Sequence, residues 1–279
     1  MLLIDLLVST MNYRPGGLDR LLATVPDFVN VIVVNQMTDA SECQEPFHIA
    51  PNVRCYSFQE TGLSRSRNRL ISLANGEVFV ICDDDIEFIP GSFDKIARAF
   101  SEDTTQDILT FMALEPDGRL RKPYKNRSYQ HNKFTIAKVT SFEIAARKRS
   151  IAEHNIKFDE SFGLGANYPM GEEVIFLLDC LNAGLKIRFV PIAINIHPQE
   201  STGRKFSIVS ENSRGAVFYR LYGWLSYFVG FGFYFRKRLA LAATIGYGGA
   251  VRAYFEGIHD YKEYRKKKLP DQFACARTQ

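Results

Sequence analysis

Three consecutive carboxylates follow a run of apolar residues, and this junction is the strongest chemical feature of the sequence. Residues 78–82 predict a buried strand, and Asp83, Asp84 and Asp85 come directly after it. Carboxylates crowded at the end of a buried strand repel one another and lose hydration, a cost that a bound divalent cation can offset. The triplet therefore predicts a metal site for a phosphorylated substrate.

Three arginines open a predicted helix over residues 64–75, at Arg65, Arg67 and Arg69. Cations near the positive end of a helix are unfavourable unless an anion is present, and a diphosphate would supply that anion. Arg65 and Arg69 share a face at i, i+4 spacing, whereas Arg67 points elsewhere, so at most two of the three can reach one ligand. The alternative is an arginine face exposed to solvent.

Strands and helices alternate along much of the chain. Strands are predicted for residues 2–9, 31–35, 53–58, 78–82, 108–113 and 186–196, and helices for 18–25, 64–75, 93–100 and 172–182. This alternation predicts an α/β fold with a mostly parallel sheet covered by helices on both faces. Ligands of such sheets bind beyond the carboxyl ends of the strands, and the aspartate triplet lies at such an end.

Residues 116–138 lack periodicity and are rich in basic and polar side chains, which predicts a long, mobile loop over the site. Basic residues gather at 119–127 and again at 262–268, although the net charge is only +4. These clusters indicate local contacts with polyanions or a membrane surface, or simply solvated loops. A nucleic acid is not among the expected partners.

The composition is that of a folded enzyme. With 279 residues, of which 46% are hydrophobic and 24% charged, the chain can bury one large domain and an appendage. Five cysteines, an odd number without a C-x-x-C pair, predict reduced thiols in the cytoplasm. The apolar start of the chain is interrupted by Asp5 and is interpreted as a first strand rather than a targeting signal.

The sequence beyond Phe206 changes character. Residues 216–235 contain ten aromatic side chains and one charge, at Arg220, and Arg236, Lys237 and Arg238 follow. The uncharged part, residues 221–235, is shorter than the roughly 20 residues that span a bilayer. An interfacial helix pair in peripheral contact with an anionic membrane is predicted. The alternative is a helical hairpin that packs on the catalytic domain or on a second subunit, as in a homo-oligomer.

Two segments carry a resemblance to a known family. Residues 62–85 read G-L-S-R-S-R-N-R-L-I-S-L-A-N-G-E-V-F-V-I-C-D-D-D, which resembles the G-L-S-x-A-R-N…G-E-Y…L-D-x-D segment of glycosyltransferase family 2. Gly171-Glu172-Glu173, followed by an apolar helix and Ala183-Gly184, is similar to the family's G-E-D helix. The resemblance covers roughly residues 2–203.

The family's fold implies a domain organisation. The resemblance implies a Rossmann-like GT-A domain over residues 1–206, with a nucleotide-binding half at about 1–115 and an acceptor half at about 139–206. Residues 207–279 would form the C-terminal, aromatic-rich helical region, for which membrane association is predicted.

The resemblance assigns the aspartates to the D-x-D motif. Asp85 would hold Mn²⁺ or Mg²⁺ on the donor diphosphate, and Asp83 or Asp84 would contact the ribose or the metal's waters, with Asp83 a further candidate ligand. His197 is similar to a late histidine that some members place on the metal or the diphosphate, and a neutral imidazole can complete such a shell. A structural histidine at a strand end is the alternative.

The donor pocket of the family is lined by the ends of the first two strands. Here these ends are Ser9-Thr10 and Asn35-Gln36, where many members carry two acids. A carboxamide can both donate to and accept from a pyrimidine, so recognition of a base survives this departure, although the choice of base is less certain. Alternatively, Asn35 satisfies backbone groups of a turn. The resemblance adds Arg65, Arg67 and Asn68 to the donor-binding set.

Glu173 takes the place of the residue that resembles the family's general base. Its extra methylene, relative to the family's aspartate, would move the carboxylate by about 1.5 Å, so Glu172 competes for the role. A helix start lowers the basicity of an acid, which burial or a neighbouring acid must counter. The alternative is that both glutamates merely favour the first turn of the helix.

The resemblance implies a metal-dependent, inverting glycosyltransferase, cytoplasmic and peripheral on the inner face of the membrane. It would move a sugar from a nucleotide-sugar, with a UDP-sugar favoured, to a hydroxyl of a glycan or lipid-linked glycan in surface polysaccharide synthesis. One alternative is a nucleotidyltransferase, although residues 12–17 offer only Arg14-Pro15-Gly16-Gly17 as a glycine-rich loop. Another is a catalytically silent, membrane-docked glycan-binding or scaffold protein.

Overall fold

The computed structural model describes residues 2–38, 46–197 and 206–275 of the 279. The chain forms two compact units. One unit comprises Met1–Glu160 and Glu172–Glu200, and the other comprises Ser161–Gly171 and Ser201–Gln279. Ser161–Gly171, which the sequence places within the catalytic domain, thus groups with the C-terminal helices.

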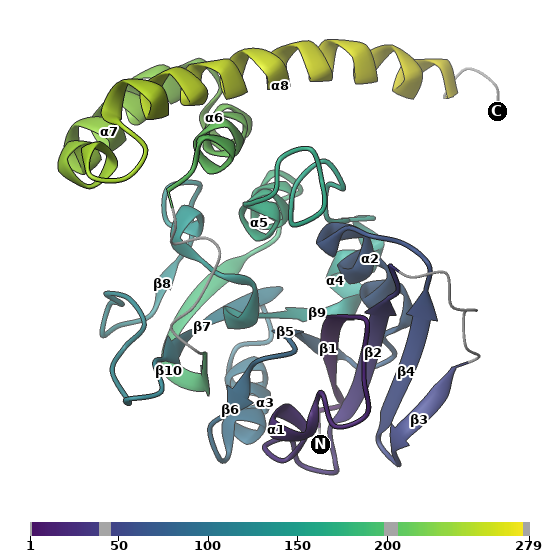
Figure 1. The fold of residues 1–279 in the computed structure, drawn as a ribbon. Helices are drawn as coiled ribbons and strands as arrows, with labels where there is room; N and C mark the ends of the chain where they lie inside the picture. The colour runs from purple at the N-terminus through teal and green to yellow at the C-terminus, as the bar shows by residue number, and fades with distance from the viewer. Residues whose placement is uncertain (1, 39–45, 198–205, 276–279) are drawn as a thin grey trace. The chain divides into compact units, whose positions relative to one another are not determined.

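The first unit contains a mixed, mostly parallel sheet, which confirms the predicted fold class (Figure 1). In the described part of the chain the sheet has ten strands in the order β3-β4-β2-β1-β5-β9-β7-β10-β6, with β8 paired to β10. Their bounds are Ile4–Met11 (β1), Asn30–Gln36 (β2), Phe47–Ala50 (β3), Val53–Phe58 (β4), Val78–Asp83 (β5), Glu87–Phe88 (β6), Ile108–Leu114 (β7), Tyr129–Gln130 (β8), Ile144–Arg147 (β9) and Ile187–Ile196 (β10).

The parallel pairs join β4 to β2, β2 to β1, β1 to β5 and β7 to β10. Strand β9 separates the two parallel groups and runs antiparallel to both β5 and β7. The helices and short 3-10 turns of this unit are α1 (Asp19–Leu22), α2 (Leu63–Leu73), α3 (Ser92–Glu102), α4 (Lys148–Glu153), α5 (Glu172–Asn182), η1 (Ile136–Lys138) and η2 (Ser141–Glu143). Helix α1 is shorter than predicted, and the basic loop at 116–138 includes β8 and η1.

The core of the first unit is built by the alternating apolar residues of the parallel strands. Leu6, Val8, Val33 and Val80 are fully buried, and burying apolar side chains is the main favourable term in folding. Cys55, Cys82 and Cys180 are also buried and unbridged. Desolvation raises the pKa of the Cys55 thiol to about 11, which keeps it protonated and unreactive at neutral pH.

Strand β5 is fixed at its start by a buried acid. Asp5 Oδ2 accepts hydrogen bonds from the backbone N–H groups of Asn75 at 2.6 Å and of Gly76 at 2.7 Å. A Cβ at Gly76 would lie 2.9 Å from Asp5 and from the carbonyl oxygen of Leu3, so only glycine fits without a shift. This contact sets the register of the strand that carries the aspartate triplet.

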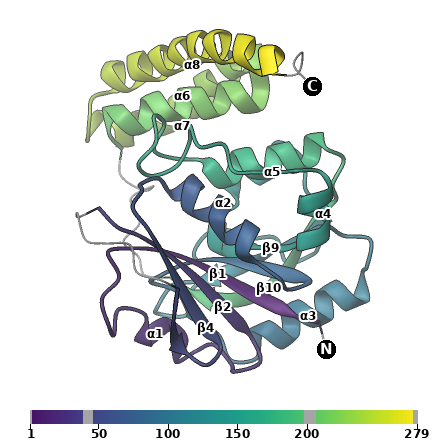
Figure 2. The ribbon, with the colours of Figure 1, turned by 90° about the vertical axis from the view of Figure 1, so that its right-hand side faces the viewer.

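The second unit is helical, with α6 (Ile208–Tyr222), the 3-10 turn η4 (Gly223–Leu225), α7 (Ser226–Ala242) and α8 (Tyr247–Cys275). Helix α8 runs alongside α6 (Figure 2). Glycines allow this close approach, because a Cβ at Gly215 would lie 2.1 Å from the carbonyl oxygen of Tyr254, and one at Gly257 1.8 Å from that of Asn212. None of the described helices combines the length and apolarity needed to cross a bilayer.

Candidate active site

The ends of three adjacent parallel strands form the candidate site. In the sheet register Ser9 of β1 lies opposite Asp83 of β5, and Thr10 lies opposite Asn35 of β2. Parallel pairing brings the carboxyl ends of the strands to one edge, so residues remote in sequence become neighbours. Ser9, Thr10, Asn35, Gln36 and the aspartates are therefore gathered at one edge, as the sequence predicts.

Arg67 occupies the centre of this site. Its side chain is only 2% exposed, and its guanidinium donates from Nη2 to Asp83 Oδ1 at 2.9 Å and from Nη1 to Glu172 Oε1 at 2.7 Å. Burial acts to lower the pKa of Arg67, but the two carboxylates outweigh it and raise the pKa. A permanently charged guanidinium therefore joins the start of α2, the end of β5 and the start of α5.

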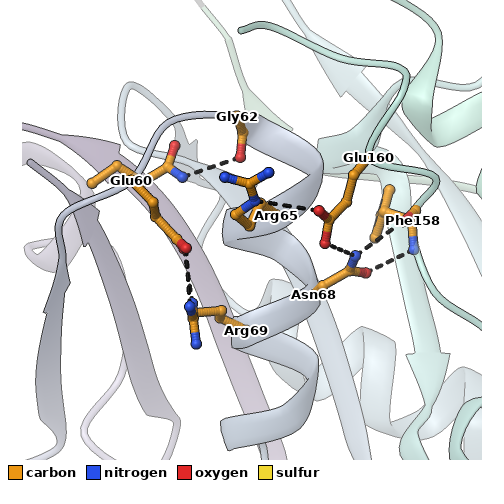
Figure 3. Close-up of polar contacts among 8 residues, drawn as sticks. Glu60, Gly62, Arg65, Asn68, Arg69, Phe158 and Glu160 are labelled. Atoms are coloured by element: carbon orange, nitrogen blue, oxygen red, sulfur yellow. Dashed lines mark hydrogen bonds and ion pairs between the residues drawn. The ribbon is translucent and has the colours of Figure 1, made fainter. Parts of the chain in front are cut away.

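The other arginines of α2 are paired with carboxylates of the protein (Figure 3). Arg65 Nε donates to Glu160 Oε2 at 3.2 Å, and both side chains are about half exposed. Arg69 binds Glu60 through two hydrogen bonds, of 2.8 Å and 3.0 Å. The helical spacing correctly predicts that Arg67 faces another way, but the anions near these arginines are glutamates, which sequence reasoning did not find.

Asn68 holds the loop that precedes α5 (Figure 3). Its Nδ2 donates to the carbonyl oxygen of Phe158 at 2.9 Å, and its Oδ1 accepts from the N–H of Phe158 at 2.7 Å. The Phe158 ring in turn lies 5.5 Å from the guanidinium of Arg67. Although the resemblance places Asn68 in the donor-binding set, its amide is engaged in this backbone pairing.

The side-chain amides of Asn35 and Gln36, which are expected to line the nucleotide pocket, form hydrogen bonds within the protein. Asn35 Oδ1 accepts from the N–H of Tyr13 at 2.9 Å, and its Nδ2 donates to Ser57 Oγ at 3.2 Å. This arrangement matches the alternative in which Asn35 satisfies a turn. Gln36 Nε2 donates to the carbonyl oxygen of Gly62 at 3.1 Å, so this side chain ties β2 to the start of α2. Binding of a base by Asn35 and Gln36 stays a prediction.

Ser9 also connects its strand to α2. Its Oγ accepts a hydrogen bond from Ser66 Oγ at 3.0 Å, and both serines are buried. Arg67, the next residue of the helix, is thereby held beside the end of β5. The hydroxyl of Ser9 thus helps to position α2 at the site. Its contact with the nucleotide-sugar stays a prediction.

The three aspartates have three different partners. Asp83 is bound by Arg67, Asp84 Oδ2 accepts from Thr10 Oγ1 at 2.5 Å, and Asp85 Oδ1 lies 3.7 Å from His197 Nε2. Burial is the main reason that the pKa of Asp85 is raised; His197 opposes this effect, and the Asp83 and Asp84 charges add to it. A bound cation would therefore stabilise the ionised carboxylate of Asp85.

His197 is a buried side chain at the end of β10. Its backbone N–H donates to the carbonyl oxygen of Leu114 at 3.0 Å, and its ring packs on Phe142 with the centroids 4.5 Å apart. Within the described residues, no three His, Cys, Asp or Glu side chains gather in an arrangement that could hold a metal ion by themselves. Asp85 and His197 could still supply two ligands, because Mg²⁺ and Mn²⁺ commonly complete their shells with water and substrate phosphates.

The two glutamates of α5 are in different environments. Glu172 is buried and bound to Arg67, whereas Glu173 keeps partial exposure. Desolvation, reinforced by the neighbouring Glu172 charge and opposed by Arg67, raises the pKa of Glu173 to about 8. Glu173 is therefore the carboxylate that can take up and release a proton near neutral pH, and Glu172 is the one that holds the arginine.

The basic loop is anchored to the site by residues that the sequence analysis missed. Lys122 Nζ lies 2.7 Å from Glu143 Oε2, and the hydroxyl of Tyr124 donates to Glu143 Oε1 at 2.5 Å. Burial lowers the pKa of Lys122, while the charges of Glu143 and Glu173 act to raise it. The Thr140–Glu143 spacing of a capping box was the one local signal that could have identified Glu143.

The same loop brings Arg121 close to the histidine. Arg121 Nη1 donates to the carbonyl oxygen of His197 at 3.3 Å, and its guanidinium lies 5.4 Å from the centre of the Phe142 ring. Arg121 and Lys122 are thus cations from outside α2, one beside His197 and the other paired with Glu143. The sequence predicts a basic loop over the site, but no local pattern predicts that Arg121 contacts the carbonyl oxygen of His197.

Comparison with known proteins identifies the family. A model described as glycosyl transferase family 2 matches residues 10–156, which is more than half of the 279 residues. The chain belongs to glycosyltransferase family 2. This assignment confirms the resemblance inferred from the G-L-S and D-D-D segments. A search of curated proteins found no match.

Solved structures of S. aureus TarS share the fold of this family member. The structure of TarS 1-349 is 14% identical with a TM-score of 0.56, and the match covers 78% of this chain and 64% of that chain. The complex with UDP is 16% identical with a TM-score of 0.57, covering 78% and 64%, and the complex with UDP-GlcNAc is 14% identical with a TM-score of 0.59, covering 78% and 66%. At these identities the likeness shows a common GT-A-like fold, and this chain spans about two thirds of the length of the TarS chain.

Replacement of Arg67 tests whether its ion pairs hold the site together. Arg67→Met leaves Asp83 and Glu172 without their cation, and breaking a buried pair in this way costs about 3–5 kcal/mol of unfolding free energy. Urea denaturation followed by circular dichroism measures the loss. Arg149→Met is the matched control, because its ion pair with Glu153 is exposed, and its denaturation midpoint should not change. An unchanged midpoint for Arg67→Met would contradict the central role of Arg67.

Proposed function

We propose that this family member is a glycosyltransferase that moves a sugar from a nucleotide-sugar to a hydroxyl of a glycan, with inversion at the anomeric carbon. The observation that carries the proposal is the Arg67 ion-pair cluster, which joins Asp83 at the end of β5 to Glu172 at the start of α5. A transfer between two substrates requires donor-binding and acceptor-activating groups at fixed separation. The cluster provides that arrangement.

A UDP-sugar is the proposed donor. Support comes from the family, and from TarS, which shares the fold and has been crystallised with UDP and with UDP-GlcNAc. The end of β1 and the end of β2 would line the pocket for the nucleotide, with Ser9 opposite Asp83 and Thr10 bonded to Asp84. The Arg121 and Lys122 cations would add to the positive charge around a diphosphate.

The proposed reaction uses the raised pKa of Glu173. Glu173 would accept the proton of the acceptor hydroxyl as its oxygen attacks the anomeric carbon, and the bond to the diphosphate would break on the opposite face of the sugar. The configuration inverts because a single displacement takes place. A base whose pKa lies near the working pH gives the most effective proton transfer, and the raised pKa of Glu173 satisfies this condition.

A divalent cation would be held by Asp85 and His197, together with oxygen atoms of the donor. When bound, it would offset the negative charge that develops on the leaving diphosphate. Asp83 would not need to be a ligand, since its carboxylate is bound by Arg67. Asp84 would be oriented by its hydrogen bond from Thr10.

The acceptor is proposed to be a glycan or a lipid-linked glycan of surface polysaccharide synthesis. A lipid-linked acceptor would meet the enzyme at a membrane surface, which would place the protein peripherally on the inner leaflet. Glu173 is assigned to the acceptor because it lies in the first turn of α5, the helix that resembles the G-E-D helix of the family.

Glu173→Gln should remove the general base while keeping the size of the side chain. We expect kcat for sugar transfer to fall by about 10²–10⁴-fold, the usual contribution of a positioned base. Stabilisation of the variant by UDP in a thermal-shift assay should persist, because Glu173 lies on the acceptor side. Glu153→Gln, at an exposed helix position, is the control and should keep full activity. Full activity of Glu173→Gln would refute the assignment.

A different result would contradict catalysis as such, and not only the role of Glu173. If no nucleotide-sugar is turned over by the unaltered protein, although UDP stabilises it, the glycan-binding or scaffold interpretation is favoured over catalysis.

The pH dependence of the reaction follows from the raised pKa of Glu173. The base must be ionised, so kcat/KM should rise with pH, about tenfold per unit below a pKa near 8, and level off above it. Initial rates between pH 6 and pH 10, roughly two units on either side of that value, measure the profile. A rate that is flat between pH 6 and pH 8 would show that Glu173 does not control the reaction.

The metal and donor assignment can be tested without an acceptor. Because a ligand that binds only the folded protein raises its apparent stability, UDP with Mn²⁺ should raise Tm more than either alone. Asp85→Asn should lose the Mn²⁺-dependent part of the shift and keep a smaller shift with UDP. Asp117→Asn, an exposed loop acid, is the control and should behave like the unaltered chain. An equal shift with and without Mn²⁺ would contradict a metal at Asp85.

A further inference from the structure

Helix α7 carries a row of exposed apolar side chains. Trp224 in η4 and four residues of α7 recur at spacings of three or four, which places them on one face of a helix. Their exposed fractions are 68% for Trp224, 68% for Phe228, 71% for Phe231, 59% for Phe235 and 78% for Leu239. We call these five residues the α7 ridge. Contiguous apolar surface of this kind marks an interaction site in a folded protein.

The opposite face of α7 is firmly packed within its own unit. Ser226, Gly230, Tyr234 and Leu241 are buried, and a Cβ at Gly230 would lie 2.4 Å from the ring of Tyr254 in α8. The hydroxyl of Tyr254 donates to the carbonyl oxygen of Ser226 at 2.7 Å. The α7 ridge is therefore not a core face that has lost its neighbour, because the helix already buries its other side.

A buried acid fixes the same inner face. Glu211 of α6 is fully buried, accepts from the hydroxyl of Tyr234 at 2.5 Å, and pairs with Arg214 Nε at 3.1 Å. Rotation of α7 to hide the α7 ridge would leave this carboxylate without its tyrosine, which is costly for a buried charge. The exposure of the ridge is thus built into the packing.

The charges around the α7 ridge have one sign. Arg236, Lys237 and Arg238 are exposed in the same helix, and Arg238 lies 4.6 Å from the centre of the Phe235 ring. Helix α7 contains no aspartate or glutamate. With about 100° of rotation per residue, Arg236 and Arg238 flank the α7 ridge, whereas Lys237 points to the other side of the helix. A face of Trp and Phe flanked by cations of its own helix is complementary to anionic lipid headgroups above an apolar layer.

The length of the helix determines how it could lie in a bilayer. Helix α7 has 17 residues and would extend about 25 Å, which is shorter than the roughly 30 Å apolar core of a membrane. An orientation in the plane of the surface is therefore the one that buries the ridge and leaves the cations at the headgroups. This excludes a spanning role for α7.

We propose that the α7 ridge is a docking surface for an anionic lipid bilayer, in which α7 lies flat with Trp224, Phe228 and Phe231 inserted and the flanking Arg236 and Arg238 at the phosphates. A second copy of the chain fits less well. In a symmetric dimer the same surface meets itself, and the cations of one α7 find no acid on the other. The proposal is independent of the reaction at the other unit.

Trp224 is the only tryptophan of the chain, so its fluorescence reports directly on the ridge. With the full-length protein, vesicles of phosphatidylcholine and phosphatidylglycerol should shift the emission maximum to shorter wavelength and sediment with the protein. Vesicles of phosphatidylcholine alone should have a smaller effect, and added salt should weaken binding to the acidic vesicles. The absence of a shift and of co-sedimentation with acidic vesicles at low salt would overturn the proposal.

Variants separate the apolar and the charged contributions. Phe228→Ser/Phe231→Ser should weaken vesicle binding by at least about tenfold, because both rings lose their burial in the lipid. Phe134→Ser is the matched control, as Phe134 is an exposed phenylalanine of the other unit, and its binding should not change. Arg236→Gln/Lys237→Gln/Arg238→Gln should remove the preference for acidic vesicles. Equal binding by all of these variants would refute the assigned surface.

A second outcome would assign the surface to another copy of the chain. Sedimentation velocity without lipid would then show a dimer that Phe228→Ser/Phe231→Ser abolishes, and the Trp224 emission would shift with protein concentration alone. That result would overturn the membrane proposal. Circular dichroism of each variant confirms that it is folded, which is expected because the substituted side chains are exposed.

Discussion

The two ion pairs of the buried Arg67 are the interaction on which the candidate site depends. The guanidinium of Arg67 lies between Asp83 and Glu172, and Glu172 is 105 residues after Arg67 in the chain. Removing a cation from water is unfavourable, and only the simultaneous presence of both carboxylates offsets the loss of hydration. Helix α2, the end of β5 and the start of α5 cannot move apart without leaving a buried charge unpaired. The end of β5 and the start of α5 are therefore held together by one residue.

This constraint also gives chemically identical side chains different properties. Glu172 is paired with Arg67, whereas the adjacent Glu173 is desolvated and lies beside the Glu172 charge, which raises the pKa of Glu173. Among the aspartates, Asp83 forms an ion pair with Arg67, and Asp85 lies beside His197. Acids with the same sequence context thus become a structural anion in one case and a candidate ligand or base in the other, because their surroundings differ.

The C-terminal unit uses aromatic residues in two ways. Tyr234 and Tyr254 form part of its core and hydrogen-bond to a buried acid and a backbone carbonyl, while the α7 ridge remains exposed. Gly215 and Gly257 let α6 and α8 pack backbone to backbone. The large apolar side chains of the α7 ridge stay exposed, and Arg238 lies against one of them, Phe235.

The sequence by itself determined the alternating strands, the GT-A-like fold, the family and the gathering of the strand ends, because periodicity and parallel pairing depend on local patterns. It also predicted that Arg67 faces away from Arg65 and Arg69. Only the tertiary structure decided which anion each arginine meets, since Glu160 and Glu172 approach α2 from distant parts of the chain. The same holds for the anchoring of Lys122 on Glu143 and for the exposed side of α7. Charge pairing and burial arise between segments that are close in space but not in sequence, and no single segment encodes them.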